Sequence, residues 1–150
     1  MRLRDGIHED IGKFTYVDKD TLLTPFFTSE YCKHFIGLFE ELGFEVDDNG
    51  NYDTLIHKVK GGDEICADFT EIVESVIEPE IVKAFTPAIK NRLWQGFPIP
   101  FVKKFSKVGQ KTLDLHSDNS LMTLFVKLND DFKGCRTVFP RQEWSLDDVP

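Results

Sequence analysis

Residues 113–129 read Leu-Asp-Leu-His-Ser-Asp-Asn-Ser-Leu-Met-Thr-Leu-Phe-Val-Lys-Leu-Asn. In the second half of this stretch, apolar side chains at every other position from Met122 to Leu128 alternate with a mixed set that includes Thr123 and Lys127. Successive side chains of a β-strand point to opposite faces, so the pattern predicts a strand with one uniformly apolar face. Such a strand is typical of a β-barrel or sandwich wall.

The surrounding C-terminal third has the same character. Short segments rich in Phe, Val, Leu and Thr are separated by Gly109, by the polar residues 129–131 and by Gly134. This composition predicts β-sheet from about residue 99 onward. Pro98 and Pro100 mark the point at which the pattern changes.

The N-terminal part has helical periodicity instead. An apolar stripe from Tyr31 to Leu42 predicts a helix that is capped by Thr28 or Ser29 and ends before Gly43. A second stripe, from 65 to 77, predicts a helix that stops at Pro79, because proline lacks the N–H needed to continue it. A third helix is expected over 81–94, and a short strand over 52–59.

These elements predict an α+β fold in a single domain over residues 1–150. Residues from about 1 to 98 are expected to form a helical support region. Residues from about 99 to 150 are expected to form a β-sandwich or barrel. The length of 150 residues suits one domain with a sizeable core.

Composition limits the function classes. Lys+Arg 18 against Asp+Glu 26 leaves a net charge of −8, which disfavours nucleic-acid binding. No apolar run approaches the ~20 residues that span a bilayer, and the N-terminus is too charged for a signal peptide. We therefore expect a soluble, cytoplasmic protein without membrane or nucleic-acid partners. Cys32, Cys66 and Cys135 have no C-x-x-C spacing, which predicts reduced core thiols.

His116 and Asp118 are the candidate metal ligands. Their spacing in an extended segment puts both side chains on one face, where an imidazole nitrogen and a carboxylate oxygen can bind one metal ion. His8 and Asp10 have the same spacing, but they lie in a charged N-terminal segment without a strand pattern. We expect that segment to be solvated.

From about Phe26 to Pro150, and most specifically at residues 101–129 and 131–140, the sequence resembles the prolyl and lysyl hydroxylase branch of the Fe(II)- and 2-oxoglutarate-dependent dioxygenases. The likeness comprises a first metal-binding strand, the H-x-D pair, a strand ending in Leu-Asn and a turn into a strand ending in Phe-Pro. It implies a double-stranded β-helix, or jelly-roll, with His116 and Asp118 holding iron at one mouth. It also implies 2-oxoglutarate and O₂ as co-substrates, with ascorbate as a further candidate ligand.

The implied reaction is hydroxylation of an unactivated C–H bond with decarboxylation of 2-oxoglutarate to succinate. The substrate would be a prolyl or lysyl side chain, or a small molecule. Five positions near the pair are candidates for contact with substrate or co-substrate: Phe105, Leu113, Asn119, Thr123 and Phe125.

The sequence also departs from this family. No histidine follows His116, so the family's third iron ligand is not found, and Arg136 and Arg141 come too early to bind the distal carboxylate of 2-oxoglutarate by motif. Phe105 and Leu113 lie nearest to where the family often has a tyrosine. We therefore expect a jelly-roll that is incomplete at the C-terminal end.

These departures leave two alternatives open. One is a non-catalytic jelly-roll module with a binding or structural role. The other is a cupin-like protein that binds zinc or manganese through ligands other than those assigned here. His34 and His57 are expected to have solvated structural roles.

Overall fold

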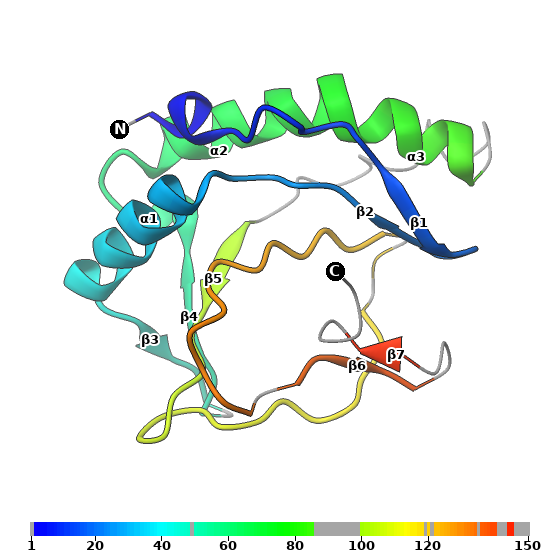
Figure 1. The fold of residues 1–150 in the computed structure, drawn as a ribbon. Coiled ribbons are helices and arrows are strands. Elements are labelled where there is room, and N and C mark those ends of the chain that lie inside the picture. Colours follow the sequence, from blue (N-terminus) through cyan, green and yellow to red (C-terminus); the bar gives the residue numbers. More distant parts are fainter. Residues whose placement is uncertain are drawn as a thin grey trace.

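A computed structural model describes residues 2–48, 50–85, 100–118, 120, 122–134, 136–140 and 144–145. Helices and strands are mixed, as the sequence predicts. A layer of helices lies above three small antiparallel sheets and the extended C-terminal segments (Figure 1).

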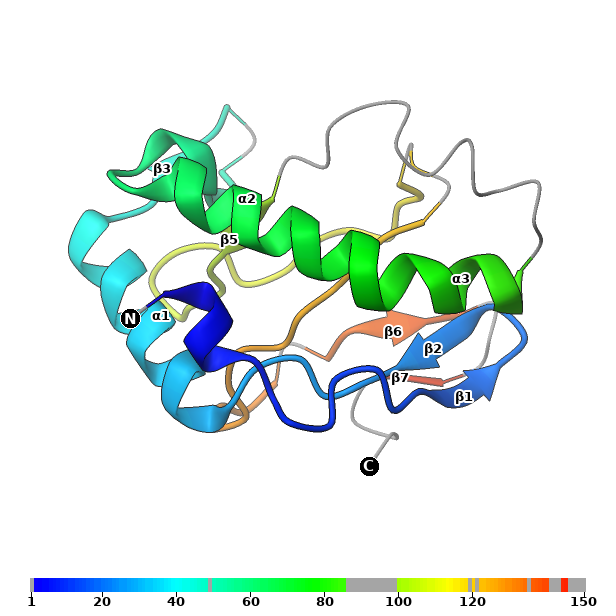
Figure 2. The same ribbon diagram turned by 90° about the horizontal axis from the view of Figure 1, so that it is seen from above.

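The helices that the structure describes lie within the first 84 residues. A 3-10 helix, η1 (Leu3–Gly6), precedes α1 (Ser29–Leu42), and a second, η2 (Ile56–Lys58), precedes α2 (Gly62–Ile72). A π-helical segment, η3 (Val73–Ile77), joins α2 to α3 (Glu78–Ala84). Figure 2 shows α2, η3 and α3 as one long continuous rod.

Among the described residues, the strands pair in short ladders. β1 (Thr15–Asp18) pairs with β2 (Thr21–Leu23), and β6 (Val138–Phe139) pairs with β7 (Trp144–Ser145). The central sheet has the order β3 (Glu45–Val46), β4 (Tyr52–Leu55) and β5 (Phe101–Lys103). This pairing joins the helical half of the chain to the segment that leads to His116.

The prediction for α1 is confirmed at both ends. The Thr28 hydroxyl accepts a hydrogen bond from the backbone N–H of Tyr31 at 3.2 Å, and Gly43 has a φ of 82° after the last turn. Glycine adopts this left-handed conformation without the steric cost of a Cβ. The stripe then buries Tyr31, Phe35 and Phe39.

The predicted helix stop at Pro79 is wrong. The rod continues through η3 to Ala84, and Pro79 lies in the first turn of α3. A proline is tolerated there because the π-helical turn before it interrupts the regular ladder: the backbone N–H of Glu78 bonds to the carbonyl of Val73, five residues back. Of the third predicted helix, residues 81–84 are helical, and residues 86–99 lie outside the described part. The predicted strand over 52–59 ends at Leu55 and continues as η2.

The core lies between η1, α1, α2 and η3. One cluster of buried side chains comprises Leu3, Tyr31, Phe35, Phe39 and Ile56, and a second comprises Phe26, Val73 and Ile77. Cys32 and Cys66 are free and half-buried, and Cys135 is outside the described residues.

The sequence predicts a solvated N-terminal segment, but the structure packs part of this segment against the helices. Leu3 is 2% exposed, and the guanidinium groups of Arg2 and Arg4 donate to the buried carboxylate of Asp68 at 3.2 and 3.0 Å. The backbone N–H of His8 donates to the Phe26 carbonyl at 2.9 Å. These contacts attach the first eight residues to α2 and to the segment before α1.

The predicted strand over 122–128 does not form a ladder. Within the described part of the chain this segment is extended but belongs to no sheet. The predicted alternation partly survives in the packing, because Val126 and Leu128 contact the two core clusters whereas Phe125 and Lys127 face solvent. The core clusters thus cover Val126 and Leu128 in part, while Leu124 on the same predicted face is 43% exposed, and a jelly-roll is not shown.

Candidate metal centre

His116 and Asp118 face each other on an exposed segment. The distance between His116 Nε2 and Asp118 Oδ1 is 3.3 Å, and the two side chains are 54% and 46% exposed. All described residues from 111 to 118 are exposed. The structure therefore brings the two candidate ligands together on one face of an extended segment, at the surface.

The orientation of the His116 imidazole is set by the contact of its Nδ1 atom. His116 Nδ1 lies 2.7 Å from the carbonyl oxygen of Asp114, which can only accept, so Nδ1 carries the donated proton. A neutral ring then has a lone pair on Nε2, directed at a carboxylate that is also only an acceptor. A cation, either a proton or a metal ion, is needed to make this contact favourable. A backbone carbonyl on the second ring nitrogen is the usual arrangement for a metal-binding histidine.

The carboxylate is also oriented. The Thr123 hydroxyl donates to Asp118 Oδ2, and the Ser120 hydroxyl lies 3.0 Å from Thr123 Oγ1. Oδ1 therefore faces the imidazole while Oδ2 is held by Thr123. Thr123, predicted as a pocket residue, thus contacts a candidate ligand directly.

The donor separation fits metal binding. Metal–ligand bonds of about 2.1 Å put neighbouring donor atoms about 3.0 Å apart in an octahedral site and about 3.4 Å apart in a tetrahedral one. The observed 3.3 Å lies between these values. Within the described residues, no group of three or more His, Cys, Asp or Glu side chains could hold a metal ion. The pair is thus a two-donor site.

The second H-x-D pair is arranged differently. The backbone N–H of Asp10 donates to His8 Nδ1 at 3.0 Å, and the Asp10 carboxylate pairs with the ammonium group of Lys13. The Lys13 hydrogen bond lowers the pKa of Asp10. Because His8 and Asp10 are directed to these other partners, the same sequence spacing does not produce a facing pair of metal donors here.

The remaining predicted pocket residues do not enclose a cavity with the pair. Phe105, Leu113 and Phe125 are 38%, 46% and 57% exposed, and Asn119 lies outside the described residues. The side chains of His34 and His57 are exposed and distant in sequence from the pair.

Gln110 positions the segment that carries the pair, and sequence reasoning missed it. Its buried side chain accepts from the Tyr52 backbone N–H at 3.0 Å and donates to Asn51 Oδ1 at 2.6 Å and to the Thr112 carbonyl at 3.1 Å. These bonds fasten the chain before residue 113 to β4. No local pattern marks Gln110, because its partners Asn51 and Tyr52 lie far away in sequence.

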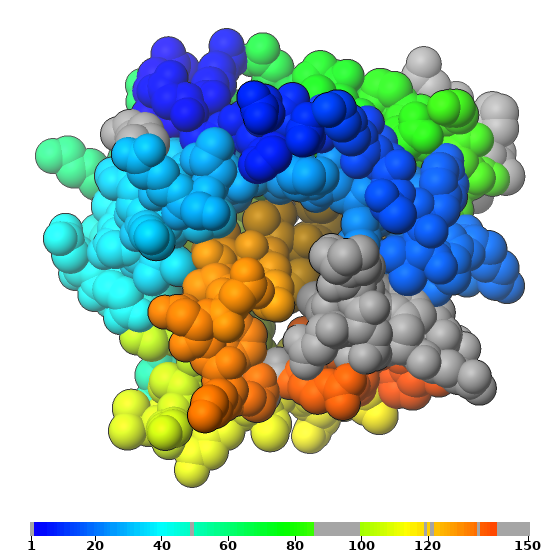
Figure 3. Space-filling model, in the orientation of Figure 1, coloured from blue at the N-terminus to red at the C-terminus, as the bar shows by residue number. Residues whose placement is uncertain are grey.

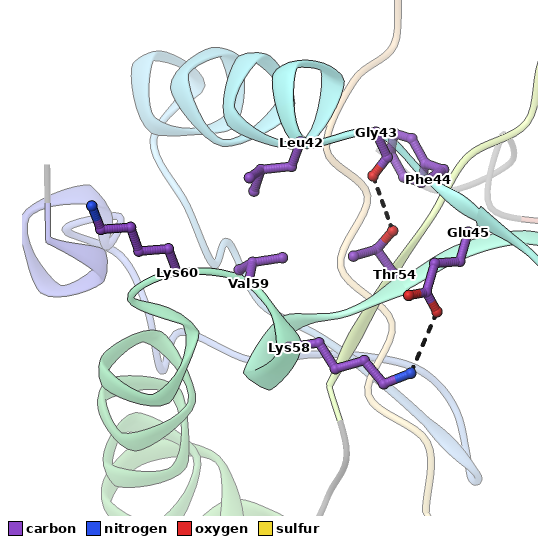
Figure 4. A pocket seen from close by; sticks show the side chains of 8 residues that line it. All are labelled: Leu42, Gly43, Phe44, Glu45, Thr54, Lys58, Val59 and Lys60. Atoms are coloured by element: carbon purple, nitrogen blue, oxygen red, sulfur yellow. Dashed lines mark hydrogen bonds and ion pairs between the residues drawn. The ribbon is translucent and has the colours of Figure 1, made fainter.

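A hollow of about 340 Å³ opens elsewhere, between the end of α1 and η2 (Figure 4). In it, Lys58 Nζ lies 3.4 Å from Glu45 Oε2, and the Thr54 hydroxyl donates to the Gly43 carbonyl at 3.2 Å. None of the residues predicted as a site lines this hollow. It therefore does not extend the candidate metal centre.

Comparisons of the chain with protein-family models, with curated proteins and with solved structures give no match. In the described part of the chain, the helices are too short or too polar to cross a lipid bilayer. A proposal for the function therefore rests on the geometry of the His116–Asp118 pair and on the sequence resemblance.

Proposed function

We propose that the protein is an Fe(II)- and 2-oxoglutarate-dependent dioxygenase in which His116 and Asp118 are two of the iron ligands. The observation that carries the proposal is the facing pair: Nε2 and Oδ1 are 3.3 Å apart, and a backbone carbonyl fixes the imidazole tautomer. An imidazole and a carboxylate are two of the three ligands in the 2-His-1-carboxylate iron centre.

The residues of this chain would bind and orient the metal. His116 presents Nε2 because Asp114 holds Nδ1, and Asp118 presents Oδ1 because Thr123 holds Oδ2. When bound, Fe(II) would supply the redox chemistry by which 2-oxoglutarate is decarboxylated and a C–H bond is hydroxylated. The candidate substrate remains a prolyl or lysyl side chain, or a small molecule.

Anaerobic thermal melting with Fe(II), with and without 2-oxoglutarate, tests metal and co-substrate binding. A ligand at 100 times its dissociation constant stabilises the fold by about 2.7 kcal/mol, or about 5–10 °C for a domain of this size. We expect Fe(II) to raise the melting temperature and 2-oxoglutarate to raise it further. Succinate should form when O₂ is admitted.

The variant His116→Ala should lose both shifts, whereas His57→Ala, which removes another exposed imidazole, should keep them. Equal shifts in the two variants, or none in the unmodified protein, would contradict the assignment of His116 as an iron ligand.

A second candidate is a metal-binding module without turnover. It is favoured by the finding that the described residues bring only two donors together. This candidate predicts a His116-dependent metal shift with no effect of 2-oxoglutarate and no succinate, so the same experiment separates it from the dioxygenase.

A further inference from the structure

We propose that Thr123 and Ser120 are positioning residues that set the metal affinity of the site by holding the Asp118 carboxylate, and that Thr123 ties this carboxylate to the helical core. The inference rests on the proposed function, because it concerns the same metal pair. It extends that function to two residues that touch no metal themselves and act only through Asp118.

The hydroxyl groups of Ser120 and Thr123 form a hydroxyl relay, in which the hydrogen bonds run in one direction. A carboxylate only accepts, so the single proton of the Thr123 hydroxyl is donated to Asp118 Oδ2. The Ser120 hydroxyl lies 3.0 Å from Thr123 Oγ1, which has no second proton to give, so Ser120 is the donor in this contact. A hydroxyl that accepts a hydrogen bond is polarised and donates more strongly to its own acceptor. Ser120 therefore strengthens the hydrogen bond from Thr123 to Asp118.

The relay is electrically neutral, so it orients Asp118 without using up its negative charge. In the described part of the chain, Asp118 has no ion pair except its contact with His116. The carboxylate of Asp10, in the other H-x-D pair, is bound instead by the ammonium group of Lys13. A metal ion would have to displace this ammonium group at Asp10, whereas at Asp118 it meets a carboxylate that is oriented but not neutralised.

Thr123 belongs to a segment that is anchored in the core. Val126 and Leu128 pack against the two core clusters. Figure 3 shows the orange atoms of the segment after residue 126 beside the light-blue and cyan atoms of α1. Side chains of an extended chain alternate between two faces, so Thr123 lies on the face opposite to Val126 and Leu128, and it is exposed. The core therefore holds one face of the segment, while the Thr123 hydroxyl on the other face binds Asp118.

The segment that carries the two ligands depends on such attachments. All residues from 111 to 118 are exposed, and none of them belongs to a strand. Gln110 fastens the start of this segment to β4. The hydrogen bond between Thr123 and Asp118 attaches its other end. His116 lies between these two attachments, so the position of both donors relative to the core depends on the relay.

Equilibrium dialysis of the full chain against Fe(II) under anaerobic conditions measures the metal affinity without turnover. Thr123→Val keeps the shape of the side chain but removes the hydroxyl, and it should weaken Fe(II) binding by about 10- to 100-fold. Thr123→Ser keeps the hydroxyl and should bind Fe(II) like the unmodified protein. Ser120→Ala should show a smaller loss. Thr112→Val, which removes an exposed hydroxyl from the ligand-carrying segment, should leave the affinity unchanged. Because all three side chains are exposed, the variants should melt like the unmodified protein when no metal is present.

An unchanged affinity in Thr123→Val, or an equal loss in Thr123→Ser, would overturn the relay but leave His116 and Asp118 as metal ligands. An unchanged affinity in Ser120→Ala would overturn the role of Ser120. Fe(II) binding that is absent from the unmodified protein, or that survives in His116→Ala, would overturn the metal site of the proposed function as well.

Discussion

The two halves of the chain use similar apolar residues with different results. Every buried apolar side chain of the two core clusters lies between Leu3 and Ile77. Among the residues that the structure describes, nine of the twelve large apolar side chains that are exposed lie between Phe101 and Val138. The helical stripes meet one another and close a core, whereas the segments after residue 100 bury little and pair only in short ladders. The candidate metal pair lies in the less buried half.

The sharpest test of this contrast is a matched pair of phenylalanine variants. Phe39 is 0% exposed and Phe125 is 57% exposed. Phe39→Ala leaves a cavity in the core and should lower the free energy of unfolding by about 3–5 kcal/mol. Phe125→Ala should change it by less than about 0.5 kcal/mol. Urea denaturation of both variants measures the difference, and similar losses would show that the C-terminal half also has a tightly packed core.

A pair of glycines tests how closely the N-terminal segment packs. A Cβ at Gly6 would lie 2.0 Å from the ring of Tyr31, whereas one at Gly37 would meet nothing within 4 Å. Gly6→Ala should therefore destabilise the fold by about 1–3 kcal/mol through overpacking. Gly37→Ala, on the surface of α1, should stabilise it by about 0.5–1 kcal/mol. Opposite signs in thermal melts are the expected result, and equal stabilities would contradict the close contact.

Gln110 connects the helical half of the chain to the segment that leads to His116. Loss of its side chain should therefore loosen that segment. Gln110→Ala removes three hydrogen bonds at a buried position and should cost about 1–3 kcal/mol. Gln110→Glu keeps an acceptor for the Tyr52 N–H but cannot donate to Asn51 or Thr112. Limited proteolysis should cut both variants faster between residues 104 and 118. Unchanged cleavage would show that the segment is held by other contacts.

The smallest effect is a pH dependence within the helical core. Burial, as the largest cause, and the negative charge of Asp68 raise the pKa of Tyr31 to about 12. The folded state therefore retains the phenol proton longer than the unfolded state, whose tyrosine ionises near pH 10. The stabilisation is complete below pH 10 and is lost as the pH rises toward 12. Tyr31→Phe should show a flatter decrease of stability over this range, and identical pH profiles would contradict the prediction.

Local signals in the sequence predict the helical half well. The cap at Thr28, the stripe from Tyr31 to Phe39 and the glycine at position 43 define α1 because each acts within a few residues. The contacts of Asp68 with Arg2 and Arg4 were not predicted, because they join residues more than 60 positions apart. The prediction of a helix stop at Pro79 is wrong, because the π-helical segment before it already interrupts the regular α-helical ladder and the rod continues past the proline.

In the C-terminal half, the alternating pattern indicates an extended chain but not its neighbours. The apolar side chains of Val126 and Leu128 are partly buried against the two core clusters, whereas Leu124 on the same predicted face is 43% exposed, so the pattern is only partly satisfied. The H-x-D spacing predicts that His116 lies beside Asp118, and the structure shows this contact. The same spacing also predicts a facing pair of His8 and Asp10, but these two side chains have other partners. Only the three-dimensional partners, Asp114 and Thr123 for the first pair and Lys13 for the second, distinguish the two.

Hydrogen exchange measured by mass spectrometry, with and without Fe(II) under anaerobic conditions, tests most directly whether the exposed half holds the metal. We predict that Fe(II) slows exchange in peptides covering residues 113–118 and 122–125, and that peptides covering α1 are unchanged. Slowing confined to residues 8–13, or no change at saturating metal, would contradict the assignment of His116 and Asp118.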